Sequence, residues 1–154
     1  MRWTALVLLA GAMFFAYIFM DILSPLQSLL QTSRGWTPEA FGHYAGSDTF
    51  LNVFVFFLIF AGIILDKMGV RFTAVLSGTV MFIGGAINYY AVTDAFAGSA
   101  LDTFFTNHLN LPQAWWNVTP WFEGMPASAK LAACGFMVFG CGAEMAGITV
   151  SRGI

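Results

Sequence analysis

The chain has 154 residues, of which 58% are hydrophobic, 17% aromatic and only 9% charged, and its formal net charge at pH 7 is −2. Soluble domains carry about a quarter of charged residues and cannot bury so large an apolar fraction at this length, so the composition excludes a water-soluble globular protein. The chain has neither a basic tail nor a basic stripe, which excludes nucleic acid as a partner. The expected partner is therefore the lipid bilayer.

Four stretches of the chain are apolar enough and long enough for spanning helices, which need about 20 residues each. The first is not a cleaved signal peptide, because only the short apolar run 5–9 precedes the cleavage-like triplet "AGA". The fold class predicted is an all-α membrane protein with four transmembrane helices. In chain order these cover residues 3–31, 38–65, 72–93 and 128–150.

Basic residues set the predicted orientation, because short cytoplasmic loops collect Lys and Arg. The segment 94–127 becomes an external loop, and it contains "WWNVTPWF", whose tryptophans we expect at the outer membrane interface. The prediction is a multi-pass protein of a bacterial inner (plasma) membrane with both termini in the cytoplasm. The basic residues on the cytoplasmic side are then Arg2, Lys67, Arg71 and Arg152.

The loop between the second and third predicted spans, "LDKMGVRF", holds three charges in a chain that has few. The basic character of cytoplasmic turns explains Lys67 and Arg71, but it requires neither Asp66 nor Gly69. A glycine at position 69 allows the tight reversal of the chain. Asp66 ends a helix at the membrane face, where its carboxylate can accept hydrogen bonds from a neighbouring helix N-terminus or from Arg71.

With its flanks, the loop "GIILDKMGVRFTAV" resembles the signature loop of the major facilitator superfamily, written G-x-L-a-D-r-x-G-r-[RK]. Ile64 and Val70 depart from that pattern. The resemblance implies a clasp that latches the two halves of a transporter in one conformation. The residues that match are Gly62, Asp66, Lys67, Gly69 and Arg71.

Shorter pieces, "YIFMDILSPL", "GAEMAG" and "SRGI", look like the branch of this superfamily that is similar to the lysosomal dipeptide uniporters. Members have twelve spans in two six-helix halves, and each half consists of two three-helix inverted repeats. The resemblance covers the first repeat and the first helix of the next. We therefore expect the chain to be a partial N-terminal half, whose missing partner is the remainder of the transporter.

Three acidic residues well inside predicted spans are candidates, because a charge at the helix centre costs about 2.5–3.5 kcal/mol on insertion scales. At about 1.5 Å per residue, Glu144 lies about 12 Å from Arg152, near the midplane. Asp48 and Asp21 are expected on the outer side, about 25 Å above Leu65 and about 27 Å above Trp3. Glu144 is the first candidate for substrate binding or proton coupling, and exposure at the outer interface is the alternative for Asp21 and Asp48.

The function predicted is part of a secondary active or facilitative transporter that moves a small solute, such as a peptide or an organic anion, by alternating access. Protons are the candidate coupling ion. The alternatives are a complete four-span assembly or scaffold protein without transport activity, and a sensor with a transporter fold. No His cluster, nucleophile elbow or paired acids at one depth supports a membrane-embedded enzyme, so no catalytic residue, cofactor or metal site is predicted.

Overall fold

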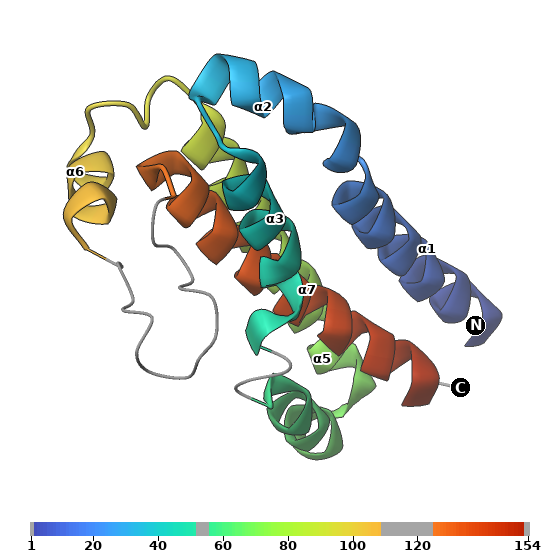
Figure 1. The fold of residues 1–154 in the computed structure, drawn as a ribbon. Helices are drawn as coiled ribbons and strands as arrows, with labels where there is room; N and C mark the ends of the chain where they lie inside the picture. The colour runs from blue at the N-terminus through green and yellow to red at the C-terminus, as the bar shows by residue number, and fades with distance from the viewer. Residues whose placement is uncertain (1, 52–55, 109–124, 153–154) are drawn as a thin grey trace.

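The computed structural model describes residues 2–51, 56–108 and 125–152, and these form helices and turns without any strand. Figure 1 shows how the helices are arranged. In chain order they are α1 (Arg2–Asp21), η1 (Ser24–Leu26), α2 (Gln27–Arg34), α3 (Pro38–Gly46), η2 (Ser47–Thr49), α5 (Phe57–Val92), α6 (Ala100–Asn107) and α7 (Ala127–Arg152).

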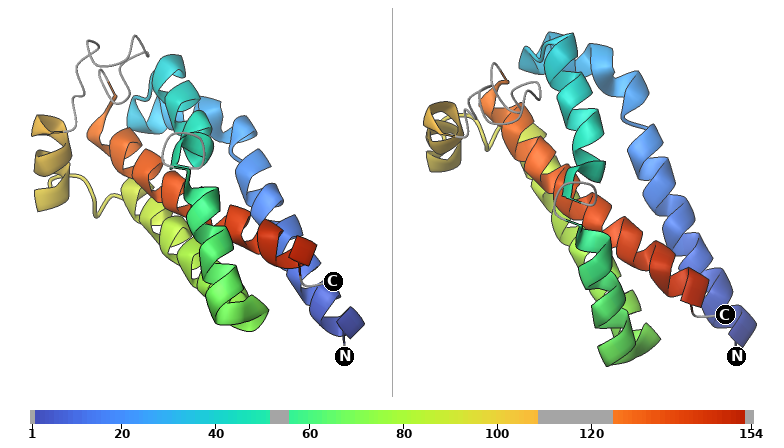
Figure 2. Two further views of the ribbon diagram at one scale, coloured as in Figure 1. Left: turned by 90° about the horizontal axis from the view of Figure 1, so that it is seen from below. Right: turned by 60° about the horizontal axis from the view of Figure 1, so that its bottom comes forward.

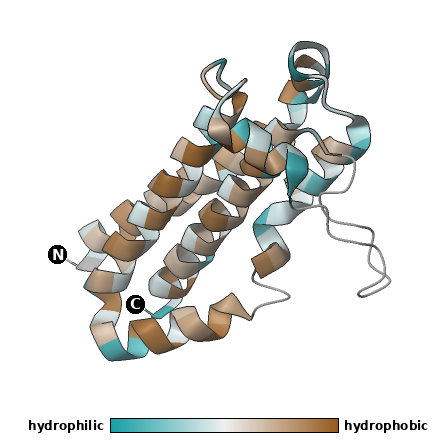
Figure 3. Ribbon diagram, turned by 90° about the vertical axis from the view of Figure 1, so that its left-hand side faces the viewer, coloured by the Kyte–Doolittle hydropathy of each residue, from teal (hydrophilic) through white to brown (hydrophobic). Residues whose placement is uncertain are grey.

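Three helical stretches within the described residues are long and apolar enough to cross a membrane: Trp3–Arg34, Phe57–Val92 and Ala127–Arg152. Figure 3 shows hydrophobic residues along these helices, with hydrophilic residues gathered mainly at turns and helix ends. An all-α chain of this kind has the character of a multi-pass membrane protein.

The first predicted span is interrupted at its proline. Helix α1 ends at Asp21, and α2 begins at Gln27 after the short turn of η1, which carries Pro25 at its start. Proline lacks a backbone donor and obstructs the preceding helical turn, which accounts for a break at this position. As Figure 1 shows, α2 consequently leaves the direction of α1 and crosses the end of the bundle.

The second predicted span, 38–65, is not one continuous helix in the structure. Helix α3 ends at Gly46, η2 follows, and α5 begins only after Phe56, whose φ of 53° lies in the left-handed region. The sequence "FLNVFVFFLIF" contains neither glycine nor proline, so it gives no signal for an interruption. The prediction of an unbroken helix therefore differs from the fold at this point.

Helix α5 is a hairpin of two arms joined at Gly69, whose φ of 81° and ψ of 168° are not helical. The first arm covers residues 57–68 and the second arm residues 70–92. Both views in Figure 2 show the second arm running back from the turn. The reversal predicted for this loop is confirmed, and the second arm matches the predicted third span closely.

Helix α7 is the centre of the bundle and contacts α5, α3, η2, α1 and α6. It packs most closely on the second arm of α5, where glycines let the two backbones approach. A Cβ atom added at Gly84 would lie 2.5 Å from the amide nitrogen of Phe139, and one added at Gly142 would lie 2.8 Å from the carbonyl oxygen of Ser77. Glycine is therefore required at both positions, because a Cβ atom would clash with the backbone of the neighbouring helix.

Of the predicted external segment 94–127, the structure describes residues 94–108 and 125–127. The described part makes turns after α5 and then forms α6, whose first turn is capped by the Ser99 side chain, which accepts from the Asp102 amide at 3.2 Å. The "WWNVTPWF" cluster lies outside the described residues, so its prediction as an interfacial anchor stays a prediction.

Candidate functional site

The matching loop residues lie at one end of the bundle, where the two arms of α5 meet. This is also the end at which α1 begins and α7 finishes (Figure 2). Gly69 adopts backbone angles that are essentially restricted to glycine. A Cβ atom there would meet no atom within 4 Å, so the requirement for glycine is conformational and not steric.

Asp66 is joined to Arg152 by an ion pair between its Oδ1 and the arginine Nη1. The pair connects the end of the first arm of α5 to the last turn of α7, 86 positions later in the sequence. The sequence suggested a helix N-terminus or Arg71 as the partner of Asp66, so Arg152 is an unpredicted one. The side chains of Asp66 and Arg152 remain 62% and 57% exposed.

An exposed ion pair of this kind contributes at most about 1 kcal/mol to stability. It is therefore suited to making and breaking during a conformational change, and it is too weak to hold the fold by itself. Lys67 and Arg71 are also exposed at this end of the bundle. Gly62 is half-buried, and a Cβ there would meet nothing within 4 Å, so contacts among the described residues do not require glycine at this position.

Glu144 lies on α7 eight residues before Arg152, and its side chain is exposed on the surface of the described chain. One turn earlier on the same face, Gly140 is covered by the backbone of Asp48. Close to this face, the Met13 methyl group lies 3.5 Å from where a Cβ at Gly147 would be. The carboxylate thus occupies an uncovered position between η2 and α1, on an otherwise apolar part of the helix.

Asp48 lies deeper in the bundle than the sequence predicts. Its carbonyl group packs directly on Gly140, which is close to the middle of α7, about 18 Å of helix from Arg152. The prediction assumed that residues 48–65 form a straight helix, and the interruption before Phe57 removes that assumption. Asp48 and Glu144 are consequently brought to neighbouring levels of α7.

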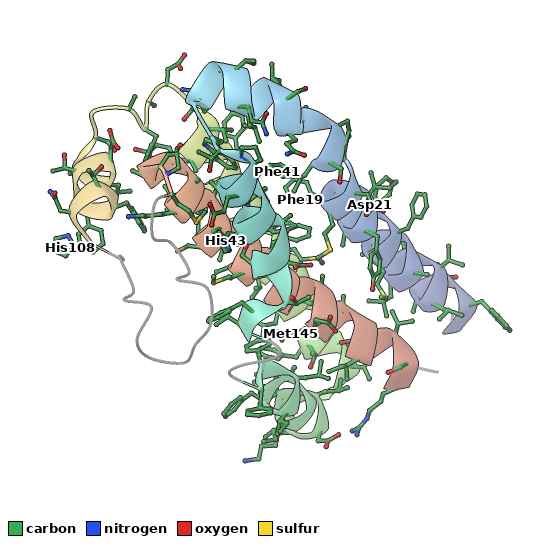
Figure 4. The ribbon with its side chains drawn as sticks, viewed as in Figure 1. Phe19, Asp21, Phe41, His43, His108 and Met145 are labelled. Atoms are coloured by element: carbon green, nitrogen blue, oxygen red, sulfur yellow. The ribbon has the colours of Figure 1, made fainter. Side chains whose placement is uncertain are left out.

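Asp21 is the last residue of α1 and is exposed. Near this end of α1, the contact with α7 is made by Phe19, whose ring lies 4.6 Å from that of Phe139. Residues two apart on a helix point roughly 200° apart, so Asp21 is directed away from this contact. Figure 4 shows Phe19 turned toward the bundle. The structure therefore does not bring Asp21 together with Glu144.

A layer of buried polar side chains between the helices was not predicted from the sequence. The Tyr44 hydroxyl donates to Asn88 Oδ1 at 2.9 Å, and the Ser47 hydroxyl donates to the Ala133 carbonyl at 3.1 Å. These bonds join α3 and η2 to α5 and α7. Asn88 was the signal for this layer in the sequence. It carries a side-chain amide inside an uncharged predicted span, and such amides usually form hydrogen bonds to a neighbouring helix.

Polar contacts between elements hold the opposite end of the bundle. Arg34 pairs with Asp94 at 2.9 Å, and the Trp36 indole donates to the Ser128 hydroxyl at 3.0 Å. The buried Lys130 ammonium donates to the Phe105 carbonyl at 2.9 Å, near the C-terminus of α6, where a cation is favourable. This end therefore has more cross-links than the end that carries Asp66 and Arg152.

The acids of the site can form ion pairs, accept hydrogen bonds and exchange protons. Within residues 2–51, 56–108 and 125–152, no group of three or more His, Cys, Asp or Glu side chains could hold a metal ion. Comparisons of the chain with protein-family models, with curated proteins and with solved structures find no match in any of the three.

Proposed function

We propose that the chain is the N-terminal part of a transporter of the major facilitator kind, which moves a small solute across the bilayer by alternating access. The observation that carries the proposal is the ion pair between Asp66 and Arg152, which joins the matching loop to the end of α7. In this proposal the exposed pair forms in one conformation and breaks in another, since so weak a contact is readily broken.

In this proposal the chain has four spans. The first arm of α5, together with α3 and η2, forms the second span, and the second arm forms the third. An interruption within a span is compatible with a transporter, because non-helical backbone occurs in membranes where it is buried in protein or lines a cavity. Asp48, in η2 just before the interruption, packs on Gly140 of α7.

The asymmetry of the two ends supports the same proposal. Among the described residues, the end near α6 is cross-linked through Trp36 and the buried Lys130, whereas the end near Gly69 has the exposed pair of Asp66 and Arg152. The less constrained end is the one that opens. Rupture of this pair is then the local event that accompanies the change of access.

Glu144 is proposed to bind the solute or to carry the coupling proton. A carboxylate on the surface of an apolar spanning helix is costly in lipid, so we place it against a solute pathway and not against acyl chains. Binding sites of such transporters lie near the bilayer midplane, and Glu144 lies about 12 Å from the end of α7. Asp48, at a neighbouring level, is the second acid of this pathway.

The test is solute uptake into membrane vesicles from cells that express the gene at its own locus, measured with a panel of dipeptides and organic anions. Glu144→Gln should abolish uptake or remove its dependence on pH, while Glu144→Asp retains part of it. Glu39→Gln, which neutralises an exposed acid at the start of α3, is the matched control and should transport normally. Normal uptake and an unchanged pH profile in Glu144→Gln would refute the role of this residue.

A further inference from the structure

A pocket of about 300 Å³ lies at the α6 end of the bundle, where four helices begin or end (Figure 1). Its wall is formed by the last turn of α2, the end of α5, the first turn of α6 and the start of α7. Two opposite charges line it, Arg34 of α2 and Asp102 of α6. The hydroxyl-bearing residues of the lining are Ser33, Thr93 and Ser128. This volume is at the lower limit of pockets that hold small molecules, so a small charged molecule fits its size and polarity.

Both charged side chains retain bonding capacity beyond the contacts they make within the protein. Arg34 pairs through Nη2 with Asp94 at 2.9 Å, and Asp94 is 99% exposed and does not line the pocket. A guanidinium has five N–H donors, so Arg34 can bind a second carboxylate through the others. Asp102 accepts from the Gly98 amide at 2.9 Å through Oδ2, while its Oδ1 accepts no hydrogen bond from the described residues.

The two charges are held apart. In the described part of the chain Arg34 and Asp102 form no ion pair with each other, although both line the pocket. Lys130 of α7 fixes α6, because its ammonium donates to the Phe105 carbonyl at 2.9 Å and to the His108 carbonyl at 3.3 Å. Opposite charges at two walls of one pocket are complementary to a ligand that carries both an ammonium and a carboxylate group.

We propose that this pocket binds a small zwitterion, an α-amino acid with an aliphatic side chain. Arg34 binds the carboxylate, and Asp102 binds the ammonium group. The apolar part of the lining, which includes Ala91, Phe96 and Ala97, receives the side chain. The site is separate from Glu144, and binding to it does not require transport. A chain that binds the amino acid but moves no solute would leave this proposal intact.

Isothermal titration calorimetry of the purified full chain in detergent tests the proposal with three compounds. These are L-leucine, leucinamide, which lacks the carboxylate, and N-acetyl-leucine, which lacks the ammonium group. At mildly acidic pH, where the amine of leucinamide is protonated, the wild-type chain should bind L-leucine. It should bind each analogue about tenfold more weakly, because each loses a charge-assisted hydrogen bond. Absence of L-leucine binding, or equal binding of the three compounds, would overturn the proposal.

Substitution of the two charged residues assigns the two ends of the ligand. Arg34→Gln should remove the preference for L-leucine over leucinamide. Asp102→Asn should remove the preference over N-acetyl-leucine, and its side-chain oxygen can still accept from the Gly98 amide. Circular dichroism shows whether both variants remain folded. Unchanged preferences in the folded variants would contradict the assignment.

Asp94→Asn is the matched control for Arg34→Gln. It breaks the same ion pair but leaves the guanidinium at the pocket, so this variant should bind L-leucine at least as tightly as the wild-type chain. If Asp94→Asn instead lost binding to the same extent as Arg34→Gln, the effect would come from the ion pair at the rim. Direct recognition of the carboxylate by Arg34 would then be wrong.

Discussion

At the residue scale, the charged loop combines a conformational requirement with an ionic one. Gly69 supplies backbone angles that other residues rarely adopt, and Asp66 supplies an acceptor for Arg152. The special roles of Gly69 and Asp66 were predictable from the sequence, because the usual excess of basic residues in cytoplasmic turns explains neither of them. The partner was not predictable, because Arg152 reaches Asp66 only through the packing of α7, and no sequence pattern gives that register.

Gly69→Ala should lower the free energy of unfolding by about 1–3 kcal/mol, because alanine is strained at this φ and ψ. Gly62→Ala is the matched control. It also adds a Cβ that meets nothing within 4 Å, but within the first arm of α5, where alanine favours the helix by up to about 1 kcal/mol. Denaturant unfolding in detergent micelles, followed by circular dichroism, measures both. Equal effects of the two substitutions would contradict this account of the turn.

The acids illustrate what depth estimates from sequence can and cannot give. Glu144 lies on an intact helix, so its predicted distance from Arg152 agrees with the structure. Asp48 was expected about 25 Å above Leu65, but the chain is interrupted between them, and Asp48 packs at the middle of α7 instead. Counting residues is reliable only where the helix is continuous.

At the scale of elements, the packing of α5 on α7 depends on glycines placed where the backbones meet. On the α7 side, Gly135 and Gly142 lie at the contacts with α5, while Gly140 lies against Asp48 of η2. Asn88 was a signal for a polar contact between helices, but its partner Tyr44 and the bond from Ser47 to Ala133 could not be predicted, because they depend on how distant parts of the chain pack.

Gly84→Val should destabilise the hairpin on α7 by about 1–3 kcal/mol more than Gly85→Val. Both variants introduce the same β-branched residue at adjacent positions of one helix. At Gly84 the new Cβ would lie 2.5 Å from the Phe139 amide nitrogen, whereas at Gly85 it would meet no atom within 4 Å. Unfolding in micelles compares the two directly. If Gly85→Val proved the more damaging variant, the described packing of α5 on α7 would be incorrect.

At the scale of the whole molecule, the two ends of the bundle differ in charge and in cross-linking. The start of α1, the turn at Gly69 and the end of α7 gather at one end, and α6 and the start of α7 lie at the other (Figure 2). Lys67, Arg71 and Arg152 therefore lie at one end of the bundle, and their common side of the membrane stays a prediction. The assignment of that side to the cytoplasm rests on the basic residues alone.

Single cysteines at Met68 and Ala97 should react from opposite sides of the membrane. Both positions are exposed, one beside the turn at Gly69 and the other between α5 and α6. The background should lack Cys134 and Cys141, the free cysteines of α7. In intact cells, an impermeant maleimide should label Ala97→Cys at once, and Met68→Cys only after lysis. Labelling of both in intact cells would exclude the proposed topology.

We propose that the pair of Asp66 and Arg152 acts as a clasp in a transport cycle. The most direct measurement is solute uptake by the two single charge reversals, Asp66→Arg and Arg152→Asp, and by the variant that carries both. Each single reversal places like charges together and should slow uptake several-fold, while the double variant restores opposite charges and should recover most of the rate. Normal uptake by both single variants, or no recovery in the double variant, would contradict the account.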